Sequence, residues 1–233
     1  MTAEPRLDII GAALADSSRS RILCTLMDGR AFTNKELASA ANISPQTASA
    51  HLKQLRSAGL TSSQQSGRHV YHRIANAEVA SVLERLATLS PMDHLARSPR
   101  RDSTGMARSC YNHIAGRLGV LMTERLVALN VLLVGIEHAA PGPHFQSFLD
   151  DLDLDLPRIG AGKPTVRLCL DWTERRHHIS GPFATEIMKM ALDKGWLARN
   201  PNSRALLITG DGYDGFQRHF GLSKEALTLI ETD

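Results

Sequence analysis

The spacing of apolar residues in the first third of the chain predicts two helices joined by a tight turn. Thr33 and Glu36 have the T-x-x-E spacing of a capping box, which satisfies free backbone N–H groups at the start of a helix. This helix should end near Asn42. Ser44 followed by Pro45 is typical of the start of the next helix. The residues expected to face the core are Leu37, Ala38 and Ala41 in the first helix, and Ala48, Leu52 and Leu55 in the second.

The second helix should end at Gly59. The side chains on its opposite face are small or polar. Side chains of this kind can lie against base edges and phosphates in the major groove of DNA. On this face lie Gln46, Thr47, Ser49, Ala50, Lys53 and Gln54. The pattern therefore predicts a helix that reads DNA.

A β-hairpin should follow, because alternating residues flank the turn signal Ser66-Gly67. Val70, His72 and Ile74 alternate with polar residues, and Arg68 lies at the expected tip. Two helices and a hairpin in this order are typical of a winged helix-turn-helix. The wing could reach the DNA backbone or the minor groove.

Charge supports the same interpretation through its distribution. The chain of 233 residues has a formal net charge of only +3, but residues 30–73 contain six Lys and Arg residues and one acidic residue, Glu36. A local positive excess is typical of a nucleic-acid-binding surface. There is no apolar run long enough to span a membrane and no signal-peptide pattern, so we expect a cytoplasmic protein without membrane contact.

These residues resemble the ArsR/SmtB family of bacterial transcriptional repressors. The similarity covers roughly residues 7–90 and includes ALAD (13–16), RIL (21–23), ELA (36–38), AGL (58–60) and the Gly67-Arg68 and Tyr71 positions of the wing. It implies a homodimer that binds a palindromic operator in double-stranded DNA and responds to an inducer. The DNA-binding residues it implies are Ser44, Pro45, Gln46, Thr47, Ser49, Ala50, His51, Lys53, Gln54, Arg68 and His69.

The chain departs from the family's metal sensors. The helix 36–40 lacks the Cys-x-Cys type of motif, and the helix expected at 77–89 offers only Glu78 and Glu84, with Asp93-His94 beyond its end. We therefore predict no metal site of either standard kind and no cofactor. The three cysteines form no C-x-x-C pair, which argues against a disulfide framework. Cys24 should be a buried small hydrophobe.

Three segments are expected: a DNA-binding domain (1–93), a basic linker that contains Ser, Pro and Gly (94–109), and a further domain (110–233). Helical spacing from Cys110 through Leu118 to Leu129 predicts a helix that also carries His113 three residues after Cys110. A second helix is expected near 144–152. The Gly160-x-Gly162 pair has no strand–helix context that would support phosphate binding.

Residues 179–208 resemble residues 43–72 at a constant offset of 136 positions, so a serine-capped helix and a hairpin are expected again. The stretch CLDWTERRHH (169–178) then falls where the preceding helix should lie. Asp171 and Glu174 would cap it, and His177 and His178 would lie at its end. The predicted fold class is mainly α with small β-wings (α+β): a winged helix-turn-helix followed by a degenerate winged-helix-like domain.

This second domain should not read DNA, because the DNA-facing positions become apolar at Phe183, Ile187 and Met190. It is better explained as a sensor or dimerisation module, and three mechanisms remain open. The first is an organic ligand bound near Trp172, Phe183, Ile187 and Trp196. The second is thiol or metalloid chemistry at Cys110 and Cys169, with His113. The third is dimerisation without any small ligand.

The function predicted is a sequence-specific transcriptional regulator, a dimeric repressor controlled by an effector in the C-terminal domain. An architectural DNA-binding protein without an effector is the alternative. A more remote alternative is an enzyme fused to the DNA-binding domain, with Cys169 as nucleophile and His177 or His178 as base. It is disfavoured because there is no nucleophile elbow, P-loop or metal-ligand motif. The protein is therefore expected not to be an enzyme.

Overall fold

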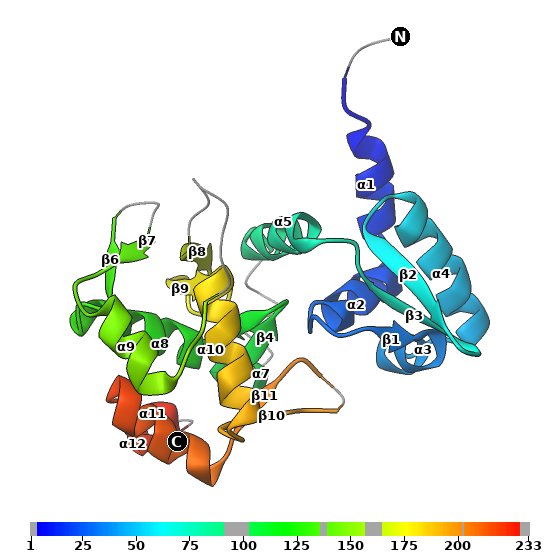
Figure 1. The fold of residues 1–233 in the computed structure, drawn as a ribbon. Helices are drawn as coiled ribbons and strands as arrows, with labels where there is room; N and C mark the ends of the chain where they lie inside the picture. Colours follow the sequence, from blue (N-terminus) through cyan, green and yellow to red (C-terminus); the bar gives the residue numbers. More distant parts are fainter. Residues whose placement is uncertain (1–3, 91–102, 136–138, 157–164, 202, 229–233) are drawn as a thin grey trace, which may run out of the picture. The chain divides into compact units, whose positions relative to one another are not determined.

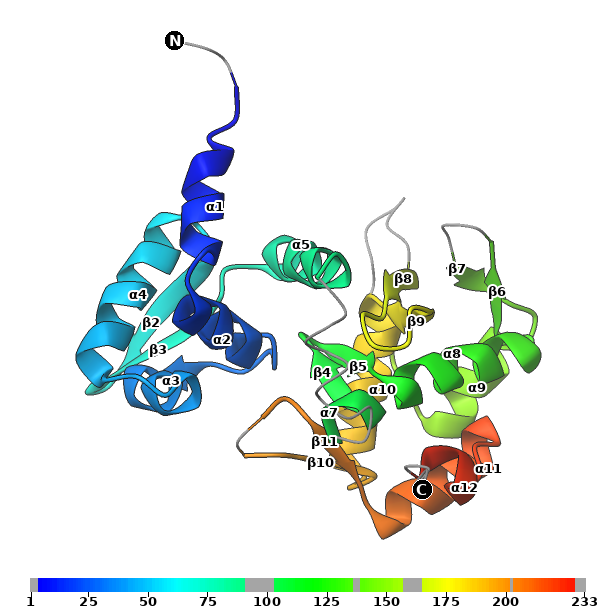
Figure 2. The same ribbon diagram turned by 180° about the vertical axis from the view of Figure 1, so that it is seen from behind.

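The computed structural model describes residues 4–90, 103–135, 139–156, 165–201 and 203–228, and its chain divides into two compact units, 1–83 and 84–233 (Figures 1 and 2). No described helix has both the length and the apolar character needed to cross a membrane. Of the expected linker, residues 94–102 lie outside the described residues, as do Asp93 and the Gly160-x-Gly162 pair. Residues 103–109 contain a short helix and the start of a strand.

The first unit is a winged helix-turn-helix, as predicted. Its elements are α1 (Leu7–Leu14), α2 (Ser17–Leu26), β1 (Phe32–Thr33), α3 (Asn34–Ala41), α4 (Pro45–Ser57), β2 (Thr61–Ser66), β3 (His69–Ile74) and α5 (Ala77–Thr88), of which residues 77–83 belong to this unit. The strands form one antiparallel sheet in the order β1-β3-β2, and β2 and β3 form the wing.

Local signals explain the turn between α3 and α4. The capping box of Thr33 and Glu36 is present, and Asn42 ends α3 with a left-handed φ of 54°. The Ser44 hydroxyl accepts a hydrogen bond from the backbone N–H of Thr47, with Pro45 in the first turn. The apolar residues predicted for this core are buried, namely Leu37, Ala38, Ala41, Ala48, Leu52 and Leu55. Cys24, however, is exposed, so its predicted burial is wrong, because it lies on a face of α2 that does not pack.

The second unit contains one order of elements twice: hairpin, helix, hairpin, helix. The short helix α7 (Ser103–Met106) comes first, and α12 (Lys224–Leu227) comes last. The first half is β4 (Arg108–Cys110), β5 (His113–Ala115), α8 (Arg117–Ala128), β6 (Leu132–Val134), β7 (Ala139–Pro141) and α9 (Phe145–Leu152). The second half is β8 (Arg167–Leu170), β9 (His177–Ser180), α10 (Pro182–Asp193), β10 (Leu197–Arg199), β11 (Leu206–Ile208) and α11 (Gly210–Phe220).

The two halves agree in detail. The sequences before α8 and α10 are HIAG (113–116) and HISG (178–181). In each half the glycine has φ of 80° or 85°, a backbone conformation that ends the strand and precedes a helix of 12 residues. Both helices are followed by a left-handed residue, at Asn130 and Gly195. The core between the halves is apolar and includes Leu118, Leu126, Phe183, Phe216 and Phe220, all fully buried.

The broad fold class, helices with small antiparallel sheets, is confirmed. The predicted helix at 144–152 is present as α9, and α10 followed by the hairpin β10–β11 matches the helix and wing expected there. Two local predictions are wrong. Residues 169–178 form the hairpin β8–β9 rather than a helix, and residues 110–115 form the hairpin β4–β5. A right-handed helix does not continue through a residue with a left-handed backbone conformation. Arg175 has this conformation in the first segment, and Tyr111 and Gly116 have it in and just after the second.

The turn of β8–β9 also changes the expected capping roles. Asp171 accepts backbone hydrogen bonds from Thr173 and Glu174, so it caps a turn and not a helix. His177 and His178 are strand residues, and the helix N-cap of α10 is Gly181 rather than Ser180.

Candidate functional site

The exposed face of α4 in the first unit is the candidate DNA interface. Ser44, Pro45, Gln46, Thr47, Ser49, Ala50, Lys53, Gln54, Arg68 and His69 are all exposed, while His51 is half-buried. Along α4 these residues share the side opposite to buried Ala48, Leu52 and Leu55. At the tip of the wing, Arg68 donates a hydrogen bond from Nε to the neighbouring His69 ring at 3.2 Å.

Arg19 of α2 holds two of the predicted DNA-binding residues. Its guanidinium donates to the Gln54 side-chain oxygen at 2.8 Å and lies 3.3 Å from Nδ1 of His51. It also donates to the backbone carbonyls of Ala12 and Ala13, at 2.9 and 2.8 Å. In the described structure His51 and Gln54 are thus tied to the helices behind α4, whereas Gln46, Ser49 and Lys53 make no hydrogen bond to another element.

The second unit brings two cysteines and two histidines together. Cys110 lies opposite His113 in the register of β4 and β5, and Cys169 lies opposite His178 in the register of β8 and β9. Directly opposite residues in an antiparallel pair project from the same face of the hairpin. Each hairpin therefore presents one thiol and one imidazole on one face.

One ligand atom from each of these four side chains lies within 4.8 Å of the other three. We call Cys110, His113, Cys169 and His178 the thiol–imidazole cluster. The Nε2 atoms of the two histidines are 3.1 Å apart, and their ring centroids are 5.0 Å apart. His178 is fully buried, Cys110 and His113 are nearly so, and Cys169 is half-buried.

Contacts inside the cluster separate the acidities of the two thiols. The hydrogen bond with Cys169, together with burial, raises the pKa of the Cys110 thiol well above its usual value. The hydrogen bond from Cys110, followed by those from His113 and His178, lowers the pKa of Cys169, although burial opposes this. Burial lowers the pKa of His113. Of the two thiols, Cys169 is therefore the more acidic.

A buried ion pair supports the cluster from the side of His178. The Arg108 guanidinium donates to the Asp171 carboxylate at 2.9 Å, and both side chains are fully buried. Asp171 also accepts from the Gly116 backbone at 2.7 Å, and its Oδ2 lies 3.5 Å from Nδ1 of His178. Burial raises the pKa of Asp171, but Arg108 and the hydrogen bond from Thr173 outweigh it and hold that pKa well below its usual range.

The other candidate effector residues are aromatic and make different contacts. Trp172 packs its ring against the Arg108 guanidinium, 4.4 Å from the ring centroid. Phe183 is fully buried between Phe145 and Phe148, and Trp196 packs on Phe216. The structure thus brings together Cys110, His113 and Cys169, whereas Phe183 and Trp196 belong to the apolar core of the unit.

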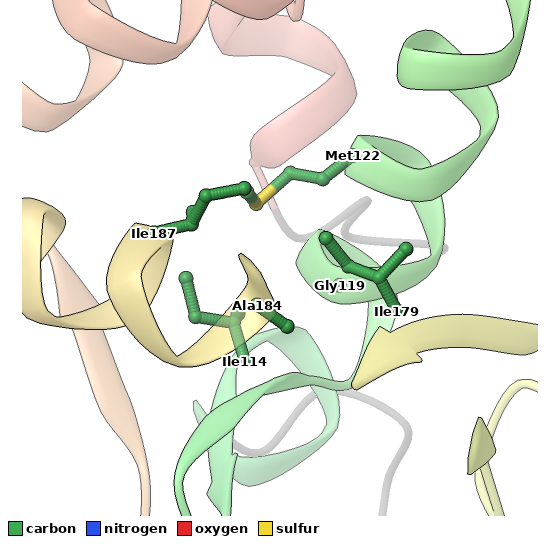
Figure 3. Close-up of a pocket in the computed structure, with 6 residues that line it drawn as sticks. All are labelled: Ile114, Gly119, Met122, Ile179, Ala184 and Ile187. Carbon is green, nitrogen blue, oxygen red and sulfur yellow. The ribbon is translucent and has the colours of Figure 1, made fainter. Parts of the chain in front are cut away.

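A small apolar cavity lies between the halves of the second unit (Figure 3). Met122 and Ile187 point toward one another across it. Its volume of about 10 Å³ is at most that of one water molecule. The lining residues form three equivalent pairs from the two halves: Ile114 and Ile179, Gly119 and Ala184, and Met122 and Ile187.

Sequence reasoning missed His178 as a member of the cluster, because it placed that residue at a helix end. Two weak signals were available. The dipeptide His-Ile occurs before a small residue and glycine at both 113–116 and 178–181, and Arg-x-Cys occurs at both 108–110 and 167–169. Together they mark the same Cys and His positions in the two halves.

Comparison with known proteins agrees with this fold. A helix-turn-helix domain family matches residues 14–64. CmtR, a helix-turn-helix-type regulator of Mycobacterium tuberculosis (strain ATCC 25618 / H37Rv), is 36% identical over 83 residues, which cover 36% of this chain and 70% of CmtR. The solved homodimeric winged helix-turn-helix domain of Mb0332 from Mycobacterium bovis, a possible ArsR-family regulator, is 30% identical, with a TM-score of 0.35; the match covers 40% of this chain and 93% of that domain.

A longer relative covers both units. YdfF, a helix-turn-helix-type transcriptional regulator of Bacillus subtilis (strain 168), is 38% identical over 224 residues, which cover 94% of this chain and 98% of YdfF. The alignment therefore extends far beyond the helix-turn-helix into the unit with the thiol–imidazole cluster. The chain belongs to the ArsR/SmtB family of winged helix-turn-helix transcriptional regulators and carries an additional C-terminal domain.

Proposed function

We propose that the protein is a dimeric repressor that binds a palindromic operator through α4 and the wing and is controlled by an effector bound in the second unit. The observation that carries the DNA-binding part is the face of α4, which is polar and exposed while its opposite face is buried. Gln46, Ser49 and Lys53 would contact base edges and phosphates, because their side chains are exposed and, within the described residues, make no hydrogen bond to another element. Arg68 and His69 would contact the flanking DNA.

His51 and Gln54 have a second role in this proposal. Since Arg19 contacts both side chains, they fix α4 against α2 as well as facing DNA. A rigid recognition helix loses less conformational entropy when it binds.

The proposal of a dimer rests on exposed apolar side chains near both ends of the segment that forms the first unit. Leu7 and Ile9 of α1 are 73% and 44% exposed, and Val82 of α5 is 54% exposed. Neighbouring exposed apolar residues on a short helix are typical of a protein–protein interface. A second copy of the chain would cover them, and two copies of α4 would then meet two half-sites of a palindrome.

The effector part rests on the thiol–imidazole cluster, since three buried donors and one half-buried donor have no role in contacting DNA. Regulation of transcription would place the protein in the cytoplasm. We expect no enzymatic turnover, because burial of Cys110, His113 and His178 leaves little access for a substrate. Turnover that survived replacement of Arg68 and of the exposed face of α4 would instead support the alternative of a fused enzyme.

Operator binding is tested by replacing Gln46, Ser49 and Lys53 together with alanine. Each lost base or phosphate contact should cost about 1–3 kcal/mol, so operator affinity should fall at least about 100-fold. The matched control is Lys189→Ala on α10, an exposed lysine of the second unit. Footprinting on the DNA upstream of the gene, with circular dichroism to verify the fold, measures the effect. Unchanged affinity in the triple variant would contradict the assignment of α4.

The alternative is an architectural DNA-binding protein without an effector. Such a protein would bind any duplex with a steep salt dependence and little preference for sequence. Competition between operator and unrelated DNA at fixed salt separates the two, since a repressor should retain a large preference for its operator.

A further inference from the structure

The strongest unassigned feature of the second unit is the convergence of four metal-ligand side chains from two separate hairpins. Cys110 and His113 come from β4–β5, and Cys169 and His178 come from β8–β9, more than fifty residues later in the chain. Their hairpins start the two equivalent halves of the unit, so each half contributes one thiol and one imidazole.

We propose that the thiol–imidazole cluster binds one thiophilic divalent metal ion of the zinc class through the two sulfur atoms and the two histidine Nε2 atoms. The regulatory consequence of this site rests on the proposed function, whereas metal binding itself does not.

The distances suit four-coordinate binding. With metal–sulfur bonds of about 2.3 Å and metal–nitrogen bonds of about 2.0 Å, ligand atoms at the corners of a tetrahedron lie roughly 3.3–3.8 Å apart. The ligand atoms of the cluster lie within 4.8 Å of one another, and the two Nε2 atoms are already 3.1 Å apart. Small side-chain rotations would therefore bring the four atoms into a tetrahedral arrangement.

The oxygen atom near Nδ1 of each imidazole favours the tautomer that leaves Nε2 available to a metal. Nδ1 of His113 lies 3.3 Å from the side-chain oxygen of Asn112, and Nδ1 of His178 lies 3.5 Å from Asp171 Oδ2. An oxygen at this position favours a proton on Nδ1 and so leaves a lone pair on Nε2. In the metal-bound form both Nε2 atoms would offer lone pairs, and a cation between the rings would replace their present 3.1 Å contact with two bonds.

Charge and burial select the class of ion. Two thiolates and two neutral imidazoles carry a charge of −2, which a divalent cation neutralises, and a buried charge is tolerated only when it is paired or coordinated. Sulfur and imidazole ligands favour zinc and similar ions over magnesium or calcium, which prefer oxygen. Burial of Cys110, His113 and His178 leaves little access for water.

Hydrogen bonds connect the cluster to α5, the helix that begins in the first unit. The backbone N–H of Ser109, next to Cys110, donates to the Arg204 carbonyl at 2.9 Å. The Arg204 guanidinium donates to Glu84 of α5 at 2.6 Å, and both side chains are largely buried. Metal binding that tightens the β4–β5 hairpin would thus act on Glu84, and through α5 on the DNA-binding unit.

Cobalt(II) titration of the full-length reduced protein tests the site, because cobalt(II) bound tetrahedrally to thiolates has strong visible d–d bands. We expect the bands to saturate at one equivalent per chain and to disappear on addition of zinc. Cys169→Ser and His178→Asn should abolish them. The matched controls are Cys24→Ser, an exposed cysteine, and His177→Asn, the exposed neighbour of His178. Absence of the bands, or their persistence in both cluster variants, would overturn the site.

Thiol alkylation of the unaltered protein avoids any effect of substitutions on folding. Zinc should protect Cys110 and Cys169 from alkylation while Cys24 continues to react. Equal reactivity of Cys169 with and without zinc would overturn the proposal. So would a Cys110–Cys169 disulfide that forms readily on oxidation in a protein that takes up no metal, since the cluster would then be a redox pair.

Operator affinity with and without zinc separates this inference from the proposed function. A zinc-dependent change of at least tenfold that is lost in Cys169→Ser supports metal control of DNA binding. If zinc binds but operator affinity does not change, the site stands and its regulatory role is wrong. If the protein binds zinc but no operator, the proposed function fails and the metal site stands.

Discussion

The two units differ in where they keep their polar side chains. The first unit exposes its polar residues along α4 and the wing and buries apolar residues beneath them. The second unit buries polar and charged groups, including Arg108, Asp171, His113 and His178. Exposed polar groups are available to a large partner such as DNA. Buried ones must satisfy one another or bind something small.

The effect of a substitution on the free energy of unfolding should follow this difference. A group at the surface can be replaced with little effect on folding, because water takes its place. A buried charge cannot lose its partner without a large loss of stability. The three predictions below test this contrast, in order of decreasing effect.

Asp171→Asn should have the largest effect, because it leaves the Arg108 guanidinium buried without its negative partner. We expect the second unit to lose about 3–5 kcal/mol of its free energy of unfolding. Both tryptophans, Trp172 and Trp196, lie in this unit, so their fluorescence during urea unfolding reports on it alone.

The control for this variant is Asp8→Asn in the first unit, which removes the exposed ion pair with Arg6 and whose unfolding is followed by circular dichroism. No measurable change is expected there. If Asp171→Asn were as stable as the unaltered protein, the contrast between buried and exposed charges would not hold for these units.

Arg19→Ala should have an intermediate effect, located in the first unit. Loss of its hydrogen bonds to Ala12, Ala13 and Gln54 should cost about 1–2 kcal/mol, given that the side chain is half-buried. Operator affinity should also fall, because α4 loses its contacts to α2. Arg21→Ala is the matched control, since Arg21 is exposed and its side chain bonds only Ser18 among the contacts described for it. Equal effects of both variants on operator binding would show that Arg19 does not position α4.

The capping box of α3 should give the smallest effect. Thr33→Ala should cost about 1 kcal/mol. Hydrogen bonds from the Thr33 backbone and hydroxyl lower the pKa of Glu36, and Arg30 and His69 contribute to the same shift. The stabilisation is therefore complete above the ordinary Glu pKa of about 4.3 and is lost as the pH falls through the lowered value.

Glu36→Gln isolates this contribution. Thermal unfolding followed by circular dichroism between mildly acidic and neutral pH should show a smaller pH dependence in the variant than in the unaltered protein. The same slope in both proteins would contradict the role of Glu36, while fluorescence of the second unit should not change in either.

Prediction from sequence succeeded where structure depends on neighbours along the chain. The capping box, the Ser44-Pro45 helix start and the Ser66-Gly67 turn are encoded within a few residues, and all three are present. Prediction failed at 110–115, where apolar spacing suited a helix, and at 169–178, where the internal resemblance placed one. There a left-handed Tyr111, Gly116 and Arg175 produce hairpins instead. The predicted burial of Cys24 was wrong for a related reason, since the sequence around it does not show which face of the helix will pack.

The sequence by itself determined the winged helix-turn-helix, its polar α4 face and the family, because these follow from local caps, turns and periodicity. Only the tertiary structure decided that Cys110 and His113 meet Cys169 and His178. The physical reason is that pairing across two hairpins places residues that are distant in the chain within 4.8 Å, and no local pattern specifies which hairpins will face one another.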